Sequence, residues 1–176
     1  MPCRDALISS VVSLKESHSF DEALALLDQN NIRSAPVIGE DSEYLGMFSL
    51  KSTFKALLPV AITMEGGLDN VDFVIGASPG IAKKLKKIGP RHIGDHIDNG
   101  IVAGHLDTPL LEAMRLMVRQ GSPLPVVDRK TGRFIGLVSE QSILNTFRHL
   151  QEIVANRPAE LSPEDVALLK EFGVLD

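Results

Sequence analysis

The chain contains the same residue pattern twice, and this duplication limits its fold more than any other feature. When Asp5 is aligned with Asp95, an offset of 90 residues, hydrophobic, Gly, Pro and Ser positions recur in step. The matched pairs are Val11-Val12 and Ile101-Val102, Glu22-Ala23 and Glu112-Ala113, Pro36-Val37 and Pro125-Val126, Gly46 and Gly136, Ser49 and Ser139, and Ser52 and Ser142. Two single-residue changes in spacing fall in turns, where a duplicated fold tolerates them. The repeat therefore predicts two equivalent folding units.

The residue pattern of each copy predicts a strand, an amphipathic helix, two strands and a second helix. Together these elements form an α/β (α+β) unit. The first helix is predicted from hydrophobic residues at spacings of three, one and three, namely Phe20, Ala23, Leu24 and Leu27, and Leu110, Ala113, Met114 and Met117. The strands are predicted at residues 11–14, 35–38 and 44–48, and at 101–103, 124–127 and 134–138. Ser49 and Ser139 are expected to cap the second helices. Thr108 is expected to cap the first helix of the second copy, with Pro109 at its first position.

Both copies end on a stretch of Gly, a hydrophobic residue, any residue, Ser, two further residues and Ser. The two stretches are Gly46-Met47-Phe48-Ser49-Leu50-Lys51-Ser52 and Gly136-Leu137-Val138-Ser139-Glu140-Gln141-Ser142. Together with the element order and the Pro-Val pair in the middle strand, they resemble the CBS domain. The resemblance implies tandem pseudo-twofold repeats. It divides the chain into a first CBS repeat at residues 1–58, a linker with a short amphipathic helix at 59–93, a second CBS repeat at 94–150 and a C-terminal helical tail at 151–176.

The resemblance also implies a function, because many CBS pairs bind adenosine-containing ligands in clefts between the repeats. The candidate ligands are AMP, ADP, ATP and S-adenosylmethionine, and no cofactor is expected. The family also implies a homodimer that regulates an unidentified protein target, which would act in trans, and no catalytic activity of its own. The expected ligand-binding residues are Val12, Ser13, Arg33, Ser34, Ala35, Pro36, Ser49, Lys51, Ser52, Val102, Ala103, Ser122, Leu124, Pro125, Ser139 and Ser142.

Ser49 and Ser139 stand at strand-to-helix junctions, where free backbone N–H groups and the helix dipole favour an anion such as phosphate. Arg33 and Lys51 give the first copy two cations for the same purpose, whereas Ser122 and its neighbours offer none in the second copy. The sequence therefore favours the first copy if only one site is used.

The chain departs from nucleotide-binding members at the last position of the closing stretch. Those members usually carry Asp there, which accepts hydrogen bonds from both ribose hydroxyls, whereas this chain has Ser52 and Ser142. Serine is shorter and uncharged, so the loss of a ribose bond is expected to weaken binding by about 1–3 kcal/mol. Two functions therefore remain open: an adenosine-ligand sensor, and a ligand-free module for dimerisation or protein docking.

Composition limits the classes of partner and the cellular compartment that we expect for the protein. A net charge of −5 argues against a dedicated nucleic-acid-binding protein, which needs a basic surface to displace counterions. The single cysteine, Cys3, excludes an internal disulfide framework and favours the cytoplasm. The first residues lack the pattern of a signal peptide, and no apolar run reaches the roughly 18 residues that a membrane span needs.

Other candidate sites are weaker. His92 and His96 are spaced to share a metal on a helix, but the Gly- and Asp-rich surroundings favour a loop. Cys3 has no evident base beside it, so a thiol nucleophile is not expected. Four lysines between residues 83 and 87 line one face of the linker helix, and a solvated surface explains them better than an anion site. A last helix after Ser162-Pro163 is expected to dock on the module or on a second subunit.

Overall fold

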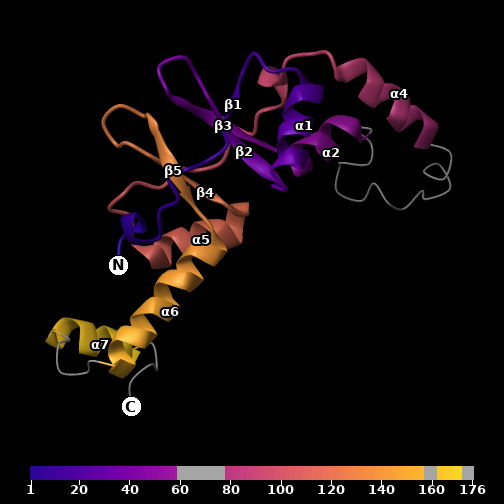
Figure 1. Cartoon of the computed structure of the whole chain (residues 1–176). Coiled ribbons are helices and arrows are strands. Elements are labelled where there is room, and N and C mark those ends of the chain that lie inside the picture. The colour runs from indigo at the N-terminus through magenta and orange to yellow at the C-terminus, as the bar shows by residue number, and fades with distance from the viewer. Residues whose placement is uncertain (59–77, 157–161, 172–176) are drawn as a thin grey trace.

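The computed structural model describes residues 1–58, 78–156 and 162–171 of the 176-residue chain and forms two α/β halves, as Figure 1 shows. The first half contains β1 (Leu14–Lys15), α1 (Phe20–Gln29), β2 (Ser34–Ile38), β3 (Tyr44–Ser49) and α2 (Leu50–Leu57). The second contains α5 (Leu110–Gln120), β4 (Leu124–Val127), β5 (Phe134–Val138) and α6 (Glu140–Asn156). Short 3-10 helices at Cys3–Ala6 and Ile93–His96, α4 (Ser78–Ile88) and α7 (Pro163–Glu171) complete the order. The predicted mixed α/β fold with two repeats is confirmed.

The two sheets follow the predicted hairpins. Strand β2 pairs antiparallel with β3 and parallel with β1, and β4 pairs antiparallel with β5. The predicted first strands are shorter than expected. The first begins only at Leu14, and the second is reduced to a single parallel bridge between Gly104 and Val126. In the second half the Gln120 side chain accepts a hydrogen bond from Val102 N at 3.0 Å and donates one to Val102 O at 2.8 Å. A side chain thus bonds both backbone polar groups of residue 102 in place of a neighbouring strand.

The starts of the two first helices differ. Ser19 caps α1 in a capping box, because its hydroxyl accepts a hydrogen bond from Glu22 N and the Glu22 carboxylate accepts one from Ser19 N. The prediction that Thr108 caps α5 is wrong. Pro109 occupies the N-cap position and has no hydroxyl, while the Thr108 hydroxyl accepts a hydrogen bond from His105 N at 2.9 Å. Helix α5 therefore begins without a side-chain cap.

Each half buries its own hydrophobic core. In the first, Phe20 and Phe48 meet edge to face with their ring centroids 5.2 Å apart, and Leu14, Leu27 and Val37 pack around them. The second core gathers residues of α5, β4, β5 and α6, namely Leu110, Ala113, Met117, Leu124, Val126, Val138 and Ile143. The predicted helical spacing therefore gives the residues that point inward, except that Met114 is exposed.

The halves exchange their first segments. Cys3 and Ala6 are buried in the second core, and Ile93 is buried in the first. Equivalent hydrogen bonds hold both segments: Cys3 N donates to Thr108 O at 2.7 Å, and Ile93 N donates to His18 O at 3.0 Å. The sequence copies thus supply their opening residues to one another.

This exchange explains the glycine in each closing stretch. Two backbone hydrogen bonds join Met47 to Asp98, and two join Leu137 to Ile8. A Cβ atom on Gly46 would lie 2.7 Å from Asp98 O, and one on Gly136 would lie against Ile8 O. Only glycine lets the exchanged backbone approach this closely.

The linker helix α4 packs on the first half. Ile81 and Leu85 pack against the first core, and the Lys84 ammonium donates a hydrogen bond to Leu57 O at 3.3 Å. Lys83 and Lys86 are exposed, in agreement with the predicted amphipathic helix. The extended segment predicted at residues 71–75 lies outside the described residues.

The C-terminal part extends away from the second half, where α6 continues well beyond the length of α2 and α7 lies near its end (Figure 1). Leu169 of α7 is buried. Within the described ranges, no helix combines the length and the apolar character needed to cross a bilayer.

Candidate functional site

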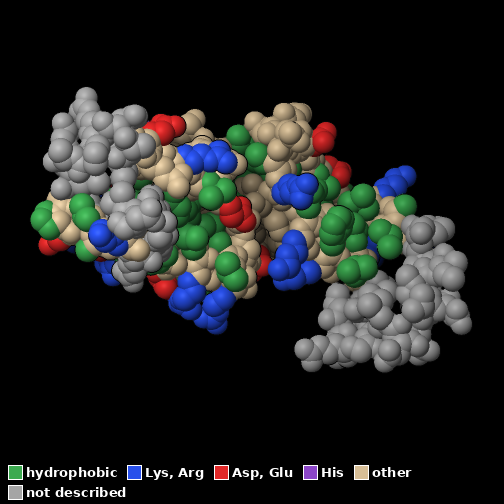
Figure 2. Space-filling view, turned by 90° about the horizontal axis from the view of Figure 1, so that it is seen from below, with side chains coloured by type: hydrophobic (Ala, Val, Ile, Leu, Met, Phe, Trp, Pro, Cys, Tyr) green, Lys and Arg blue, Asp and Glu red, His purple; other side chains and the backbone are tan. Residues whose placement is uncertain are grey.

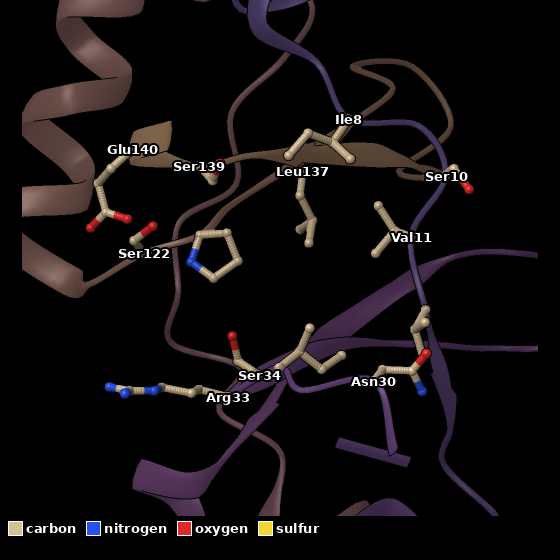
Figure 3. A pocket seen from close by; sticks show the side chains of 13 residues that line it. Ile8, Ser10, Val11, Asn30, Arg33, Ser34, Ser122, Leu137, Ser139 and Glu140 are labelled. Carbon is tan, nitrogen blue, oxygen red and sulfur yellow. The ribbon is translucent and has the colours of Figure 1, made fainter. Parts of the chain in front are cut away.

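A cleft of about 550 Å³ lies between the two halves. The close-up view of Figure 3 shows side chains of both repeats facing one another across it. Its lining residues come from the opening segment, from the turn and strand after α1, from the turn before β4, and from β5 and the start of α6: Ile8, Ser10, Val11, Val12, Asn30, Ile32, Arg33, Ser34, Ser122, Pro123, Leu137, Ser139 and Glu140. The volume falls in the range of roughly 300–1,000 Å³ that small-molecule sites occupy in proteins.

Local structure places the two walls. Arg33 and Ser34 stand where the chain leaves α1 and enters β2, so they lie on the wall formed by the first repeat. Ser139 and Glu140 stand where β5 passes into α6, and they lie on the opposite wall with Leu137. The cleft therefore combines the middle strand of one repeat with the closing stretch of the other.

The two ends of the cleft differ in chemistry. Ile8, Val11 and Leu137 give an apolar region toward the opening segment. At the other end the Arg33 and Glu140 side chains lie on facing walls, with Ser122 on the Glu140 side (Figure 3). An apolar surface beside a few convergent polar groups suits a ligand with a flat apolar part and a charged part.

The serines of the closing stretches form two equivalent capping boxes. Ser142 N donates to the Ser139 hydroxyl at 3.1 Å, and Ser139 N donates to the Ser142 hydroxyl at 3.0 Å. The corresponding distances between Ser49 and Ser52 are 3.0 Å and 2.9 Å. The predicted N-cap roles of Ser49 and Ser139 are confirmed. The hydroxyls of Ser52 and Ser142 also donate to the N-cap carbonyls at 2.8 Å and 3.0 Å, so both are already engaged within their helices.

The structure brings five of the expected ligand-binding residues together on the cleft: Val12, Arg33, Ser34, Ser122 and Ser139. Others are buried within β2 and β4, namely Ala35, Pro36, Leu124 and Pro125. Ser13 and Ala103 are half-buried, and Val102 is exposed. Ser49, Lys51, Ser52 and Ser142 lie at helix starts and are not among the lining residues. On this cleft Arg33 shares the lining with Ser139 and Glu140 of the second repeat, and Lys51 does not take part in the lining.

Sequence reasoning missed several lining residues, because the cleft joins segments of the two copies that the repeat pattern does not place together. The favoured first-copy site combined Arg33 with Ser49 and Lys51 of the same copy, whereas the closing-stretch residues on the cleft, Leu137, Ser139 and Glu140, all come from the second copy. The exchange of opening segments adds Ile8 and Ser10. The acidic Glu140 was visible in the sequence beside Ser139, but nothing in the pattern placed it opposite Arg33.

The segment around Val102 in the second repeat is equivalent to the lining segment around Val12, but its backbone makes different hydrogen bonds. There the Gln120 side chain bridges both backbone groups of Val102, as described above. Asn30, which corresponds to Gln120, instead donates to Leu26 O at 2.8 Å and lines the cleft. The two repeats thus offer chemically different surroundings to a ligand.

The weaker candidates have other contacts. The His92 ring nitrogen Nδ1 lies 2.7 Å from Ser17 O, and the His96 ring meets Phe20 edge to face. Within the described ranges, no group of three or more His, Cys, Asp or Glu side chains is placed to hold a metal ion. Burial, with a smaller contribution from the negative charge of Asp107, raises the pKa of Cys3 to about 11, which suits a structural thiol.

Curated relatives of this chain carry CBS domains or are uncharacterized. Uncharacterized protein MJ1225 of Methanocaldococcus jannaschii is 24% identical over 182 residues, covering 97% of this chain and 55% of that protein. The chloroplastic CBS domain-containing protein CBSX1 of Arabidopsis thaliana is 28% identical over 137 residues, covering 74% of this chain and 56% of that protein. The chain thus spans about half the length of these curated relatives.

Solved structures with the same fold are CBS-domain proteins. CBSX2 in complex with AMP superposes with a TM-score of 0.63 at 22% identity, covering 85% of this chain and 98% of that one. CbpB in complex with c-di-AMP gives 0.65 at 19% identity, with 89% and 91% covered. The CBS domain pair of MJ0100 with 5′-methylthioadenosine and S-adenosyl-L-methionine gives 0.58 at 19%, with 85% and 98% covered.

The family model described as CBS domain matches residues 3–59 and 95–149, which are the two copies recognised in the sequence. The two matched repeats, their symmetric packing and the shared fold all support the same family assignment. The chain belongs to the CBS domain family and contains a pair of CBS domains.

Proposed function

We propose that this CBS pair is a regulatory module that binds an adenosine-containing ligand in the cleft between Arg33 and Glu140. The observation that carries the proposal is the cleft of about 550 Å³ lined by both repeats. An adenine ring fits its apolar region of Ile8, Val11 and Leu137, and polar groups at the other end suit a 5′ substituent.

The ligands of proteins with the same fold support this choice. CBSX2, CbpB and the MJ0100 pair are bound to AMP, c-di-AMP, and 5′-methylthioadenosine with S-adenosyl-L-methionine, respectively. All of these ligands contain adenosine. The capping boxes leave the ribose without its usual carboxylate partner in this chain, so we expect the base and the 5′ substituent to supply more of the affinity.

The module acts by population shift and catalyses no reaction. A ligand that touches both walls favours the relative orientation of the repeats in which both walls reach it. A protein target in trans reads that orientation.

The test is the melting temperature of the chain with millimolar AMP, ADP, ATP or S-adenosylmethionine. Ligand at 100 times its dissociation constant adds about 2.7 kcal/mol of stability, which raises the midpoint by roughly 5–10 °C for a chain of this size. Arg33→Ala should reduce the rise. Arg148→Ala, which removes an exposed arginine of α6 outside the cleft, should not. A cooperative transition that no ligand moves would refute adenosine binding.

A ligand-free module for dimerisation is the second candidate, and a specific surface favours it. Leu111, Met114 and Val118 form an exposed apolar stripe on α5, with Val118 exposed to 88%, and Leu144 of α6 is exposed as well. Figure 2 shows hydrophobic side chains on the surface of both halves of the molecule. Water contact with such a stripe is unfavourable, so a partner surface is expected to cover it.

We propose a second copy of the chain as that partner. The positions equivalent to Leu111 and Val118 in α1 are Asp21 and Asp28. Two copies of α1 would therefore repel each other, whereas two copies of α5 can bury the stripe across a twofold axis. Dimerisation through α5 and ligand binding in the cleft use different surfaces and are compatible.

A further inference from the structure

The cleft occupies one of two positions that the sequence repeat makes equivalent. Its central lining is common to both positions, because it contains two residues of the first repeat and their two equivalents in the second: Arg33, Ser34, Ser122 and Pro123. The flanks of the two positions differ. Val12 and Asn30 line the cleft, whereas their equivalents Val102 and Gln120 do not. The local structure at Val102 therefore decides whether a second ligand has a place.

The backbone of Val102 is already bonded by the side chain of Gln120, the last residue of α5. Val102 N donates to Gln120 Oε1 at 3.0 Å, and Gln120 Nε2 donates to Val102 O at 2.8 Å. One carboxamide thus satisfies both the donor and the acceptor of a single residue. Adenine presents the same combination, a ring nitrogen that accepts beside the N6 amino group that donates. Gln120 therefore occupies the hydrogen-bonding groups that an adenine edge would use at Val102.

The backbone of Val12 lacks such a partner. Asn30 is one methylene shorter than Gln120, and its amide donates to Leu26 O at 2.8 Å in the last turn of α1. Within the residues that the structure describes, no hydrogen bond engages Val12 N or Val12 O, and Val12 lies outside β1. This donor and this acceptor are therefore available at the end of the cleft that Val11 and Asn30 line (Figure 3).

We propose that Gln120 is a built-in substitute for adenine, which keeps the second position closed and limits the chain to one adenosine ligand, bound at Val12. This inference rests on the proposed adenosine binding and adds the number of ligands and the residue that sets it. A ligand at Val102 first has to displace the carboxamide. Because two hydrogen bonds are lost in that step, the second position binds roughly ten- to hundredfold more weakly than it would without Gln120.

The test is calorimetric titration of the full chain with AMP, ATP and S-adenosylmethionine, which all present the same adenine edge. A probe that binds the wild type should bind it at one per chain and should bind Gln120→Ala at two per chain, because the variant frees Val102 N and Val102 O. Inosine monophosphate should bind the new position at least about tenfold more weakly than AMP. Its base carries an oxygen in place of the amino group and cannot donate to Val102 O.

Gln151→Ala is the matched control, because Gln151 is an exposed glutamine of α6 outside the cleft. It should bind one ligand per chain, like the wild type. If the wild type and Gln120→Ala bind equal numbers of ligands, the closure by Gln120 is wrong while adenosine binding stands. Binding to Gln120→Ala alone would refute the site at Val12 and keep Gln120 as the closing residue. If no probe binds either chain, both proposals are wrong.

Discussion

Tyr44 and Phe134 occupy the same position in the two repeats, and their rings stack on each other with centroids 6.3 Å apart and planes 24° apart. The backbone around them is equally symmetric, since Tyr44 N donates to Gly132 O and Phe134 N donates to Ser42 O. The pseudo-twofold axis therefore passes between these rings, and the pair joins the two halves beside β3 and β5.

Only one of the two rings carries a hydroxyl, and that difference gives the first prediction. The Tyr44 hydroxyl oxygen is buried and has no hydrogen-bond partner in the described structure. A buried polar atom without a partner costs about 1–3 kcal/mol. Tyr44→Phe should therefore raise the free energy of unfolding by about 1 kcal/mol, measured by urea denaturation. A loss of stability would mean that the hydroxyl has a bonding partner in solution.

The capping boxes give a second prediction. Ser52→Ala and Ser142→Ala should each lower the free energy of unfolding by about 1 kcal/mol, because each removes the side-chain half of a cap. Neither should change the affinity for an adenosine ligand by more than about twofold, since both hydroxyls bond within their own helices. A loss of affinity without a loss of stability would show that the hydroxyls contact the ligand.

A third prediction concerns the introduction of a carboxylate at the same position. Ser142→Asp keeps a good residue at the third position of α6 and adds an acceptor for ribose hydroxyls. It should strengthen adenosine binding about tenfold in calorimetric titration. Ser52→Asp is the matched control, because Ser52 holds the same position in α2, which contributes no residue to the cleft, whereas α6 contributes Glu140. Equal effects of both changes would place the ribose elsewhere.

Cys3 reports on the exchanged segment. It is 0% exposed, and burial raises its pKa from an ordinary value of 9.0 to about 11. Iodoacetamide should therefore modify the folded chain at pH 8 at least roughly 100-fold more slowly than the chain in guanidinium, because only the thiolate reacts. A similar rate in both states would show that residues 1–8 leave the second core readily.

The same pKa sets a pH dependence of stability. A raised pKa in the folded state means that folding favours the neutral thiol. The contribution of Cys3 is fully present below pH 9 and is lost as the pH rises toward 11. The difference in free energy of unfolding between wild type and Cys3→Ala should shrink over that window, in urea titrations at each pH.

The apolar stripe on α5 makes the last prediction. Val118→Asp gives α5 the residue that α1 carries at the equivalent position, so it should weaken the proposed dimer by about tenfold or more. Sedimentation velocity measures the change, and the melting temperature of the monomer should stay the same because Val118 is exposed to 88%. Ala25→Asp on α1 should leave the dimer intact. A wild type that is monomeric at all concentrations would refute the dimer.

Much of the fold could be predicted because it depends on local patterns. The spacing of Phe20, Ala23 and Leu27 fixes an inward helix face, and Ser49 marks a helix start that the structure confirms. The sequence pattern predicted a strand at residues 101–103 and gave no sign that this strand would be absent from the structure. Its loss depends on the Gln120 side chain, which reaches back from the end of α5 to Val102.

The site was harder to predict, because it depends on contacts between the copies. Comparing the copies residue by residue shows what is equivalent but not what faces what. Arg33 was therefore grouped with Lys51 of its own copy, while the fold sets it opposite Glu140 of the other. The prediction that Thr108 caps α5 was wrong for a more local reason, because the helix begins one residue later and Pro109 occupies the N-cap position.

The exchange of opening segments restricts how this architecture can be divided. Residues 1–8 complete the second core, and residues 91–98 complete the first, so a fragment holding one copy lacks a piece of its own interior and carries a piece of its neighbour's. Two such fragments can supply the missing pieces to each other only by associating reciprocally. An ancestor with a single copy would thus have been an intertwined pair, and gene duplication would have converted that obligate association into one continuous polypeptide.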